Sequence, residues 1–247
     1  MTATHRRGTW LLRRPSEEAV ARVFCFPYSG VGASMYGRWP ARTGDVELCP
    51  VQLPGRENRI REPHFGSYER LAVAVVDGLG PYLDRPFGLF GHCAGALVAF
   101  AVALELERAG LPGARCLFVS SQVAPHVGPY GSFLGMTDDQ LRTALARFVE
   151  AVGGRPQPDL LDLGMETLRP DVAANRAYRL PAPARLACAV HAIGWREDEE
   201  ILPAQMTGWA EYAAGEQFRS TVLDGGHYAF LDAPDGLLAA FELGLAR

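Results

Sequence analysis

Residues 91–95 read Gly-His-Cys-Ala-Gly and place a potential nucleophile at Cys93. An apolar run precedes this segment and a long helical pattern follows it, which predicts a sharp turn between a strand and a helix. Such a turn lifts the central side chain clear of the sheet, and glycine at positions 91 and 95 removes Cβ atoms that would clash there. Because a helix N-terminus favours negative charge, the position also favours the reactive thiolate. The spacing predicts covalent catalysis through Cys93.

A cysteine nucleophile needs a base, and His227 is the histidine that the sequence favours. It follows a strand-like run at 219–223, lies in the turn Asp-Gly-Gly-His-Tyr and precedes the last predicted helix. The chain order nucleophile, acid, histidine is typical of this kind of strand-turn-helix site. Structural roles are expected for the other five histidines, which are His5, His64, His92, His126 and His191.

The acid that orients His227 is expected in the loop that follows the strand at 187–193. This loop reads Gly-Trp-Arg-Glu-Asp-Glu-Glu-Ile-Leu-Pro, and its four carboxylates prevent a choice from spacing alone. Asp198 is favoured because it is the only aspartate and is followed by the apolar start of the next helix. Glu197 remains the alternative.

The negative charge that develops on a carbonyl oxygen under attack must be stabilised by two backbone N–H groups. Ala94, directly after the nucleophile, is expected to supply one of them. The other is expected from the loop at 26–34, Phe-Pro-Tyr-Ser-Gly-Val-Gly-Ala-Ser, in which Ser29 is favoured. A phosphate-binding role is disfavoured, because the loop has neither a Gly-Lys-Ser/Thr ending nor a GxGxxG spacing.

Short apolar runs alternate with helical patterns along the chain, which predicts an α/β protein with a mostly parallel sheet. The expected strands are 22–26, 46–51, 87–90, 116–120, 187–193 and 219–223, and the expected helices are 67–83, 94–109, 203–214 and 234–246. Together with the turn at Cys93 and the chain order, this pattern predicts a single α/β-hydrolase domain over residues 1–247.

Residues 124–182 interrupt the alternation with glycines, prolines and amphipathic helical pieces. A long insertion between two strands of such a sheet often forms a lid over the active site, so a helical lid is expected here. A peripheral helical subdomain without a gating role is the alternative.

The composition excludes several classes of protein. The net charge of −4 and the absence of a basic stripe argue against nucleic acid and anionic membranes as partners. No signal peptide or membrane span is recognisable, so the chain is expected to be cytoplasmic. A monomer is compatible with the sequence. The five cysteines are odd in number and contain no CxxC pair, which argues against a disulfide framework and a metal site. No cofactor of its own is expected. The only basic cluster is Arg6, Arg7, Arg13 and Arg14.

Taken in order, several segments resemble the type II thioesterases that accompany nonribosomal peptide and polyketide synthases. The block Leu-Pro-Gly-Arg-Glu at 53–57 is the most distinctive of them. The resemblance implies substrates that are acyl or aminoacyl groups held as thioesters on the phosphopantetheine arm of an acyl or peptidyl carrier protein. The matching segments are 24–34, Trp39, 51–63, 89–100, 168–178, 209–212 and 225–231.

Two departures from the family pattern bear on the reaction. The usual nucleophile is serine where this chain has Cys93, and the loop before the acid often reads Gly-Gly where this chain has Gly194-Trp195. With cysteine at this turn, the chain resembles a smaller set of enzymes that shuttle aminoacyl groups between carrier proteins. Thioester hydrolysis is the leading interpretation, and transfer between carriers is the alternative. A cysteine small-ester hydrolase resembling the dienelactone hydrolases is a further alternative.

Overall fold

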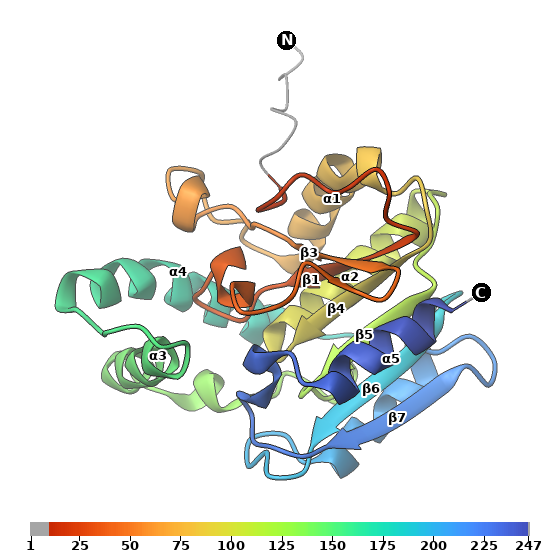
Figure 1. Cartoon of the computed structure of the whole chain (residues 1–247). Helices are drawn as coiled ribbons and strands as arrows, with labels where there is room; N and C mark the ends of the chain where they lie inside the picture. Colours follow the sequence, from red (N-terminus) through yellow and green to blue (C-terminus); the bar gives the residue numbers. More distant parts are fainter. Residues whose placement is uncertain (1–9, 247) are drawn as a thin grey trace.

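The computed structural model describes residues 10–246, so His5, Arg6 and Arg7 lie outside the described residues. A seven-stranded sheet in the order β2-β3-β1-β4-β5-β6-β7 runs through the centre of the molecule (Figure 1). Every neighbouring pair in this sheet is parallel except β2 with β3. The strands are β1 (Ala21–Phe26), β2 (Arg42–Thr43), β3 (Val46–Pro50), β4 (Phe87–His92), β5 (Cys116–Ser120), β6 (Ala189–Trp195) and β7 (Phe218–Leu223).

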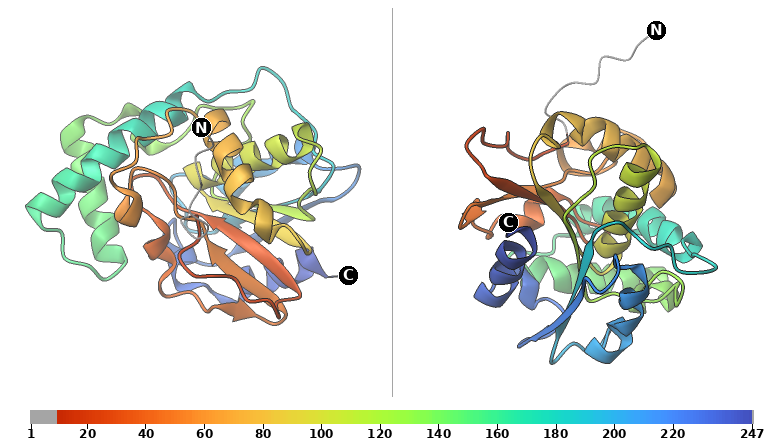
Figure 2. Two further views of the ribbon diagram at one scale, coloured as in Figure 1. Left: turned by 90° about the horizontal axis from the view of Figure 1, so that it is seen from above. Right: turned by 90° about the vertical axis from the view of Figure 1, so that its right-hand side faces the viewer.

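Helices cover both faces of the sheet, as the views in Figure 2 show. Side chains alternate along a strand, so Phe24 and Phe26 of β1 pack on the face covered by α1 and α2, whereas Val23 and Cys25 pack on the face covered by α5. The helices are α1 (Tyr68–Leu79), α2 (Ala94–Arg108), α3 (Asp138–Ala151), α4 (Pro158–Ala177) and α5 (Asp235–Leu245). The 3-10 helices are η1 (Ala33–Tyr36), η2 (Glu57–Arg59), η3 (Gly80–Tyr82), η4 (Ser132–Gly135), η5 (Pro203–Tyr212) and η6 (Ala229–Asp232).

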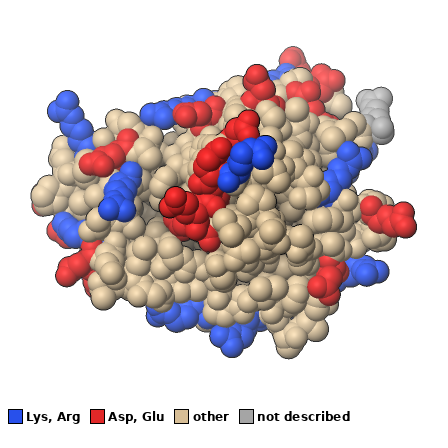
Figure 3. All heavy atoms as spheres, turned by 90° about the horizontal axis from the view of Figure 1, so that it is seen from below, with Lys and Arg blue, Asp and Glu red and all other residues tan. Residues whose placement is uncertain are grey.

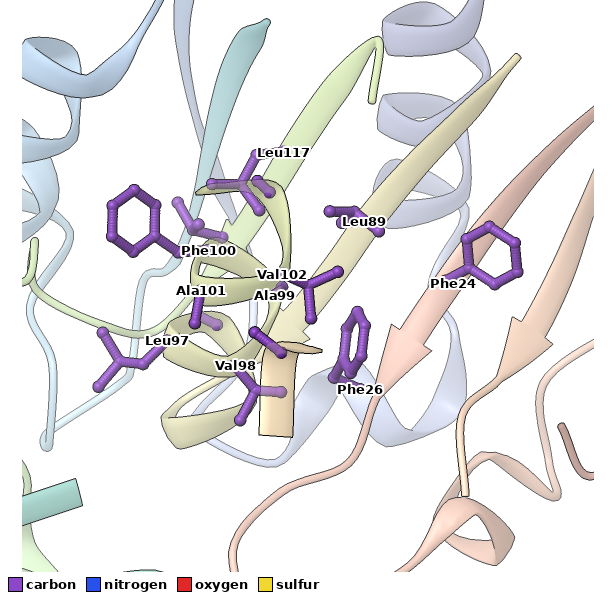
Figure 4. Close-up of a cluster of buried hydrophobic side chains, with 14 of the residues drawn as sticks. Phe24, Phe26, Leu89, Leu97, Val98, Ala99, Phe100, Ala101, Val102 and Leu117 are labelled. Carbon is purple, nitrogen blue, oxygen red and sulfur yellow. The ribbon is translucent and has the colours of Figure 1, made fainter. Parts of the chain in front are cut away.

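Helix α2 is apolar around most of its circumference and is enclosed by the core. Figure 4 shows its side chains facing Phe24 and Phe26 of β1 and Leu89 of β4. All of its residues from Ala94 to Ala103 are buried. A helix with this pattern is stable only inside a protein, and a fully buried Phe or Leu side chain contributes about 1.5–3 kcal/mol. The core therefore fixes the N-terminus of α2, where Cys93 lies.

The insertion expected at 124–182 lies between β5 and β6 and contains η4, α3 and α4. Figures 1 and 2 show α3 and α4 side by side at one end of the molecule, beyond the end of the sheet towards which the β4 and β6 arrows point. The N-terminus of α3 is well defined, since Thr137 and Gln140 form a capping box there. Whether this helical pair acts as a lid remains a prediction.

Three expected elements differ from the structure. Strand β6 continues through Gly194 and Trp195, which were expected in a loop, because Gly194 pairs with Val222 and Trp195 with Leu223 of the parallel strand β7. The fully buried Trp195 also donates through Nε1 to Ser120 Oγ at 3.0 Å. The helix expected to end at 83 changes to the 3-10 helix η3 at Gly80, next to Pro81. The expected helix at 203–214 is the 3-10 helix η5, whose buried residues recur every third position, at Met206, Trp209 and Tyr212. The short strand β2 was not predicted.

Charged groups are mixed on the surface. On the face drawn in Figure 3, acidic and basic side chains are interspersed and no continuous basic area is visible. None of the helices within residues 10–246 is both long enough and apolar enough to cross a membrane.

Candidate active site

The turn between β4 and α2 holds Cys93 in a backbone conformation that residues other than glycine rarely adopt. Its φ is 52° and its ψ is −126°. A Cβ on Gly91 would lie 2.0 Å from the carbonyl oxygen of Gly95, and a Cβ on Gly95 would lie 2.8 Å from that of Phe26. Both glycines are therefore required by close backbone contacts. A strained φ of this kind costs about 1–3 kcal/mol and is typical of functional sites.

His227 and Asp198 lie in direct contact, each in a loop beyond the carboxyl end of a strand. Nδ1 of His227 is 3.0 Å from Oδ2 and 3.2 Å from Oδ1 of Asp198. Both side chains are buried, at 7% and 0% exposure. The Cys93 thiol is close enough to His227 to raise the pKa of the imidazole. Within residues 10–246, the Nε2 atom of His227 has no hydrogen-bond partner of regular geometry. The structure thus brings together Cys93, His227 and Asp198.

The environment stabilises a charged imidazolium beside a charged carboxylate. Burial alone lowers the pKa of His227, but the hydrogen bond to Asp198 and the contact with Cys93 outweigh it and raise the pKa to about 10. Burial alone raises the pKa of Asp198, but His227 and then Ser121 outweigh it and hold the pKa well below its usual range. This pair is suited to hold a proton at His227, next to the Cys93 sulfur.

Ser121 is a positioning residue that the sequence analysis missed. Its φ is 45°, and its hydroxyl donates to Oδ2 of Asp198 at 2.7 Å. The backbone N–H groups of Glu200 and Ile201 donate to Oδ1 of the same carboxylate at 2.9 and 3.1 Å. Three donors besides His227 therefore fix the Asp198 carboxylate.

Glu197, the alternative acid, does not face His227. Its carboxylate accepts a hydrogen bond from the backbone N–H of Gly225 instead. The geometry therefore favours Asp198 over Glu197 as the partner of His227.

The other described histidines lie in structural surroundings. His92 is buried against the Phe230 ring and bonds through Nδ1 to Ser120 Oγ at 2.9 Å. Burial lowers its pKa well below the usual value, and burial also lowers the pKa of His191 to about 4. Neutral imidazoles are therefore expected at both positions. His126 lies against Tyr212, and His64 pairs with Asp171.

The two expected oxyanion donors have free backbone N–H groups. Within residues 10–246, neither Ser29 nor Ala94 donates its N–H to an acceptor, whereas the neighbouring N–H groups of Tyr28 and Gly30 are used by Met35 and Asp171. Ser29 and Ala94 line the same small cavity. This arrangement is compatible with an oxyanion hole, and the assignment remains a prediction.

The distinctive Leu-Pro-Gly-Arg-Glu block anchors helix α4 to the loop that carries Ser29. The Arg56 guanidinium makes two bonds to the buried carboxylate of Asp171 on α4, at 2.8 and 2.9 Å, and a third to the Val31 carbonyl oxygen at 3.1 Å. Asp171 also accepts from Gly30 N–H at 2.8 Å and bonds His64 at 2.8 Å. Sequence patterns indicated that both segments matter, but not that they meet.

Asp171→Ala is expected to lower the free energy of unfolding by about 3–5 kcal/mol, because it leaves the buried Arg56 charge uncompensated. Burial alone raises the pKa of Asp171, but Arg56 and His64 outweigh it and lower the pKa. The carboxylate therefore stabilises the fold above its unfolded pKa of about 4, and this stabilisation is lost as the pH falls below that value. Urea denaturation at neutral and acidic pH measures both effects.

The matched control for this prediction is Asp162→Ala on the same helix. Asp162 pairs with Arg142 at the surface, where its side chain is 68% exposed, so a loss below about 1 kcal/mol is expected. Equal losses for the two variants would contradict the anchoring role of Asp171.

Tyr28, Phe133 and Phe148 form a group of contacting rings that we call the aromatic cover. The Tyr28 ring stacks on Phe148 at 5.5 Å and meets Phe133 edge-on at 5.7 Å. Cys93 belongs to the same hydrophobic cluster and is only 8% exposed. Phe148 lines an apolar cavity of about 440 Å³ between α3, α4 and the loop at 30–38. Phe133 lines a more polar cavity of about 430 Å³ beside α3.

The parallel sheet, the turn at Cys93, the acid after β6 and the histidine after β7 define the architecture of an α/β-hydrolase. The family model of the Thioesterase domain matches residues 21–243, and the chain belongs to this family. Within residues 10–246, no group of three or more His, Cys, Asp and Glu side chains is arranged to hold a metal ion.

Individual relatives extend over most of the chain. It is 31% identical over 240 residues to the linear gramicidin dehydrogenase LgrE of Brevibacillus parabrevis. The aligned region covers 94% of this chain and 91% of LgrE. It is 34% identical to the AMB antimetabolite synthetase AmbE of Pseudomonas aeruginosa over 99% of this chain but only 12% of AmbE. RedJ, a thioesterase from the prodiginine biosynthetic pathway in Streptomyces coelicolor, has a similar structure with a TM-score of 0.77, 34% identity and coverage of 95% of this chain and 96% of RedJ. These findings confirm the α/β-hydrolase fold and the resemblance to thioesterases.

Proposed function

We propose that this thioesterase-family enzyme removes acyl or aminoacyl groups from the phosphopantetheine arm of a carrier protein through a thioester intermediate on Cys93. The observation that carries the proposal is the placement of Cys93 at the strained turn before α2, next to a histidine that a buried aspartate holds at 3.0 Å. A nucleophile, a base and an orienting acid in this arrangement are the parts that acyl transfer requires.

The first half of the reaction forms the acyl enzyme. His227 takes the thiol proton of Cys93 through Nε2, and the thiolate attacks the thioester carbonyl carbon. The N–H groups of Ser29 and Ala94 stabilise the negative charge on the carbonyl oxygen. The pantetheine sulfur then leaves as the carbonyl re-forms, and the imidazolium returns the proton to it.

The second half regenerates the enzyme. His227 accepts a proton from a water molecule, which attacks the carbonyl carbon of the acyl-Cys93 thioester. The acid is released, and the Cys93 sulfur leaves and recovers its proton from His227. No cofactor of the enzyme is needed for these steps, because the substrate itself is an activated thioester.

The relatives support a carrier protein as the partner. RedJ is a thioesterase from a biosynthetic pathway. AmbE is a synthetase, and the region similar to this chain makes up 12% of its length. By analogy, the substrate of this chain is proposed to arrive on the arm of an acyl or peptidyl carrier protein.

Transfer to a second carrier is the second candidate function, and the cysteine nucleophile favours it. An acyl-Cys93 is itself a thioester, so its exchange with a pantetheine thiol is close to thermoneutral and reversible. This feature suits an enzyme that passes the group to another thiol.

The proposal is tested by incubating the protein with an acylated carrier and a second, empty carrier, followed by intact mass spectrometry of all three proteins. Loss of the acyl group from the donor, with a transient adduct on the enzyme, is the expected result. Release as free acid indicates hydrolysis, and acylation of the second carrier indicates transfer. A donor that stays loaded would contradict the proposal, and turnover of a free ester at a similar rate would favour a small-ester hydrolase.

Cys93→Ser is expected to change the partition between these two products. An acyl-serine is an oxoester, which is a poorer acceptor for a returning pantetheine thiol, so transfer should fall more than hydrolysis. A decrease of about tenfold or more in the ratio of acylated second carrier to free acid is expected, measured for both proteins under the same conditions. An unchanged ratio would mean that the identity of the nucleophile does not govern the fate of the acyl group.

A further inference from the structure

The carboxylate of Glu200 lies inside the candidate active site. Its Oε2 atom is 4.0 Å from Nε2 of His227, the ring nitrogen that faces away from Asp198. The backbone of Glu200 is fixed by its N–H bond to Asp198, and Oε2 accepts a hydrogen bond from Ser132 Oγ at 2.6 Å. The side chain is 27% exposed. Glu200 therefore presents a positioned, half-buried negative charge next to the atom that must face the substrate.

This negative charge has no fixed cation. Within residues 10–246, Glu200 forms an ion pair with no Lys or Arg, and its single charged contact is with His227. It lines the polar cavity of about 430 Å³, where Asp139, Arg147 and Tyr228 are the other titratable groups. Two carboxylates and one guanidinium leave this cavity with an excess of negative charge.

The position of Glu200 matches that of an amino group on a bound acyl chain. The carbonyl carbon of an acyl-Cys93 lies one bond from the sulfur, close to Nε2 of His227, and the α-amino group of an aminoacyl chain lies two bonds further on. A carboxylate near Nε2 is therefore within reach of that ammonium group. The larger cavity of about 440 Å³ is mostly apolar and has Arg38, Arg56 and Glu57 in its lining, but within residues 10–246 none of these three forms an ion pair with His227.

We propose that Glu200 binds the ammonium group of an aminoacyl thioester, so that the enzyme selects aminoacyl over simple acyl substrates. This inference rests on the proposed function and names its substrate class. Recognition occurs through a carboxylate–ammonium pair in a partly dehydrated cavity, where such a pair is stronger than in water. Arg147 lines the same cavity, but within residues 10–246 the ion pairs of His227 are with Asp198 and Glu200, and it is Glu200 that lies beside Nε2.

The test uses the alanyl and propionyl thioesters of N-acetylcysteamine, which mimic the end of the pantetheine arm and differ in the ammonium group. The readout is the ratio of kcat/KM for alanyl over propionyl thioester. Wild type is expected to favour alanyl, and Glu200→Gln is expected to lower the ratio by about 10- to 100-fold, the range for a hydrogen bond to a charged group. Glu199→Gln, at the exposed neighbouring position, is the matched control and should leave the ratio unchanged.

Four outcomes would overturn the inference. An unchanged ratio in Glu200→Gln, even with a general loss of activity, would mean that Glu200 acts on His227 alone. A wild-type preference for a succinyl thioester over both substrates would assign the cavity to Arg147 and a carboxylate. If neither thioester acylates Cys93, as measured by the intact mass of the enzyme, the proposed function itself would be wrong. Normal propionyl turnover without alanyl preference would remove the role of Glu200 while leaving the proposed function in place.

Discussion

Cys93→Ala is expected to abolish covalent capture of the acyl group and to reduce turnover by at least about a thousandfold. Every step of the proposed reaction passes through the Cys93 sulfur, and a missing nucleophile removes the benefit of its base as well. The measurement is the intact mass of the enzyme after mixing with an acylated carrier, with peptide mapping of the adduct. Wild type should carry the acyl group on the peptide that contains Cys93, and the variant should carry none.

The other cysteines provide the controls. All of them are buried, and burial raises the pKa of each thiol, so none should compete as a nucleophile. Cys188→Ala is a suitable matched variant, because Cys188 is 6% exposed, similar to Cys93. It directly precedes the first residue of β6, whereas His227 lies beyond the carboxyl end of the parallel strand β7. Label that persists in Cys93→Ala and maps to one of these positions would contradict the assignment of the nucleophile. The positions are Cys25, Cys49, Cys116 and Cys188.

His227→Ala is expected to be nearly as damaging as loss of the nucleophile, with a decrease in kcat of about 10³- to 10⁴-fold. His227 removes the thiol proton in the first half of the reaction and activates water in the second. Asp198→Asn should have a milder effect, since Asp198 orients the imidazole and takes no direct part in bond formation. Single-turnover acylation and steady-state turnover, measured separately, test both halves. Glu197→Gln is the matched control, and a larger loss there than in Asp198→Asn would reverse the assignment of the acid.

The stability of the protein should also depend on His227. Its pKa is raised to about 10 in the folded state, so the protonated form stabilises the fold. This stabilisation is fully present below the unfolded value of about 6.5 and is lost as the pH rises through about 10. The thermal unfolding temperature of wild type should therefore fall as the pH rises across this interval. His227→Ala should not show this part of the pH dependence. A variant with the same pH profile as wild type would contradict the charged state inferred for the site.

The parts of the site that depend on neighbouring residues were predictable from the sequence. Gly91, Cys93 and Gly95 form a local strand-turn-helix pattern, and the structure shows why each glycine is needed. The strands and the order of the candidate residues follow from the same kind of local signal. The assignment of Asp198 over Glu197 stayed open, because the path of a single loop decides which carboxylate turns towards His227.

Long-range contacts could not be predicted in the same way. Ser121 directs its hydroxyl to Asp198 only because its φ is 45° at the end of β5, which no residue pattern indicates. Arg56 and Asp171 lie in two separate motifs, and only the packing of α4 shows that they form one buried ion pair. The extension of β6 to Trp195 likewise depends on partners in another strand, Val222 and Leu223 of β7.

The aromatic cover has a consequence for how tightly substrates bind. Cys93 is only 8% exposed and belongs to the same hydrophobic cluster as Tyr28, Phe133 and Phe148. If a thioester reaches the sulfur only when some of these rings have moved aside, binding requires a second, open arrangement of the molecule. The apparent dissociation constant is then the intrinsic constant of that open form divided by the fraction of molecules that adopt it; an open population of about 1% would weaken binding about 100-fold. Changes in ring size at these positions would therefore shift a conformational equilibrium and alter affinity, while the reacting groups themselves stay in place.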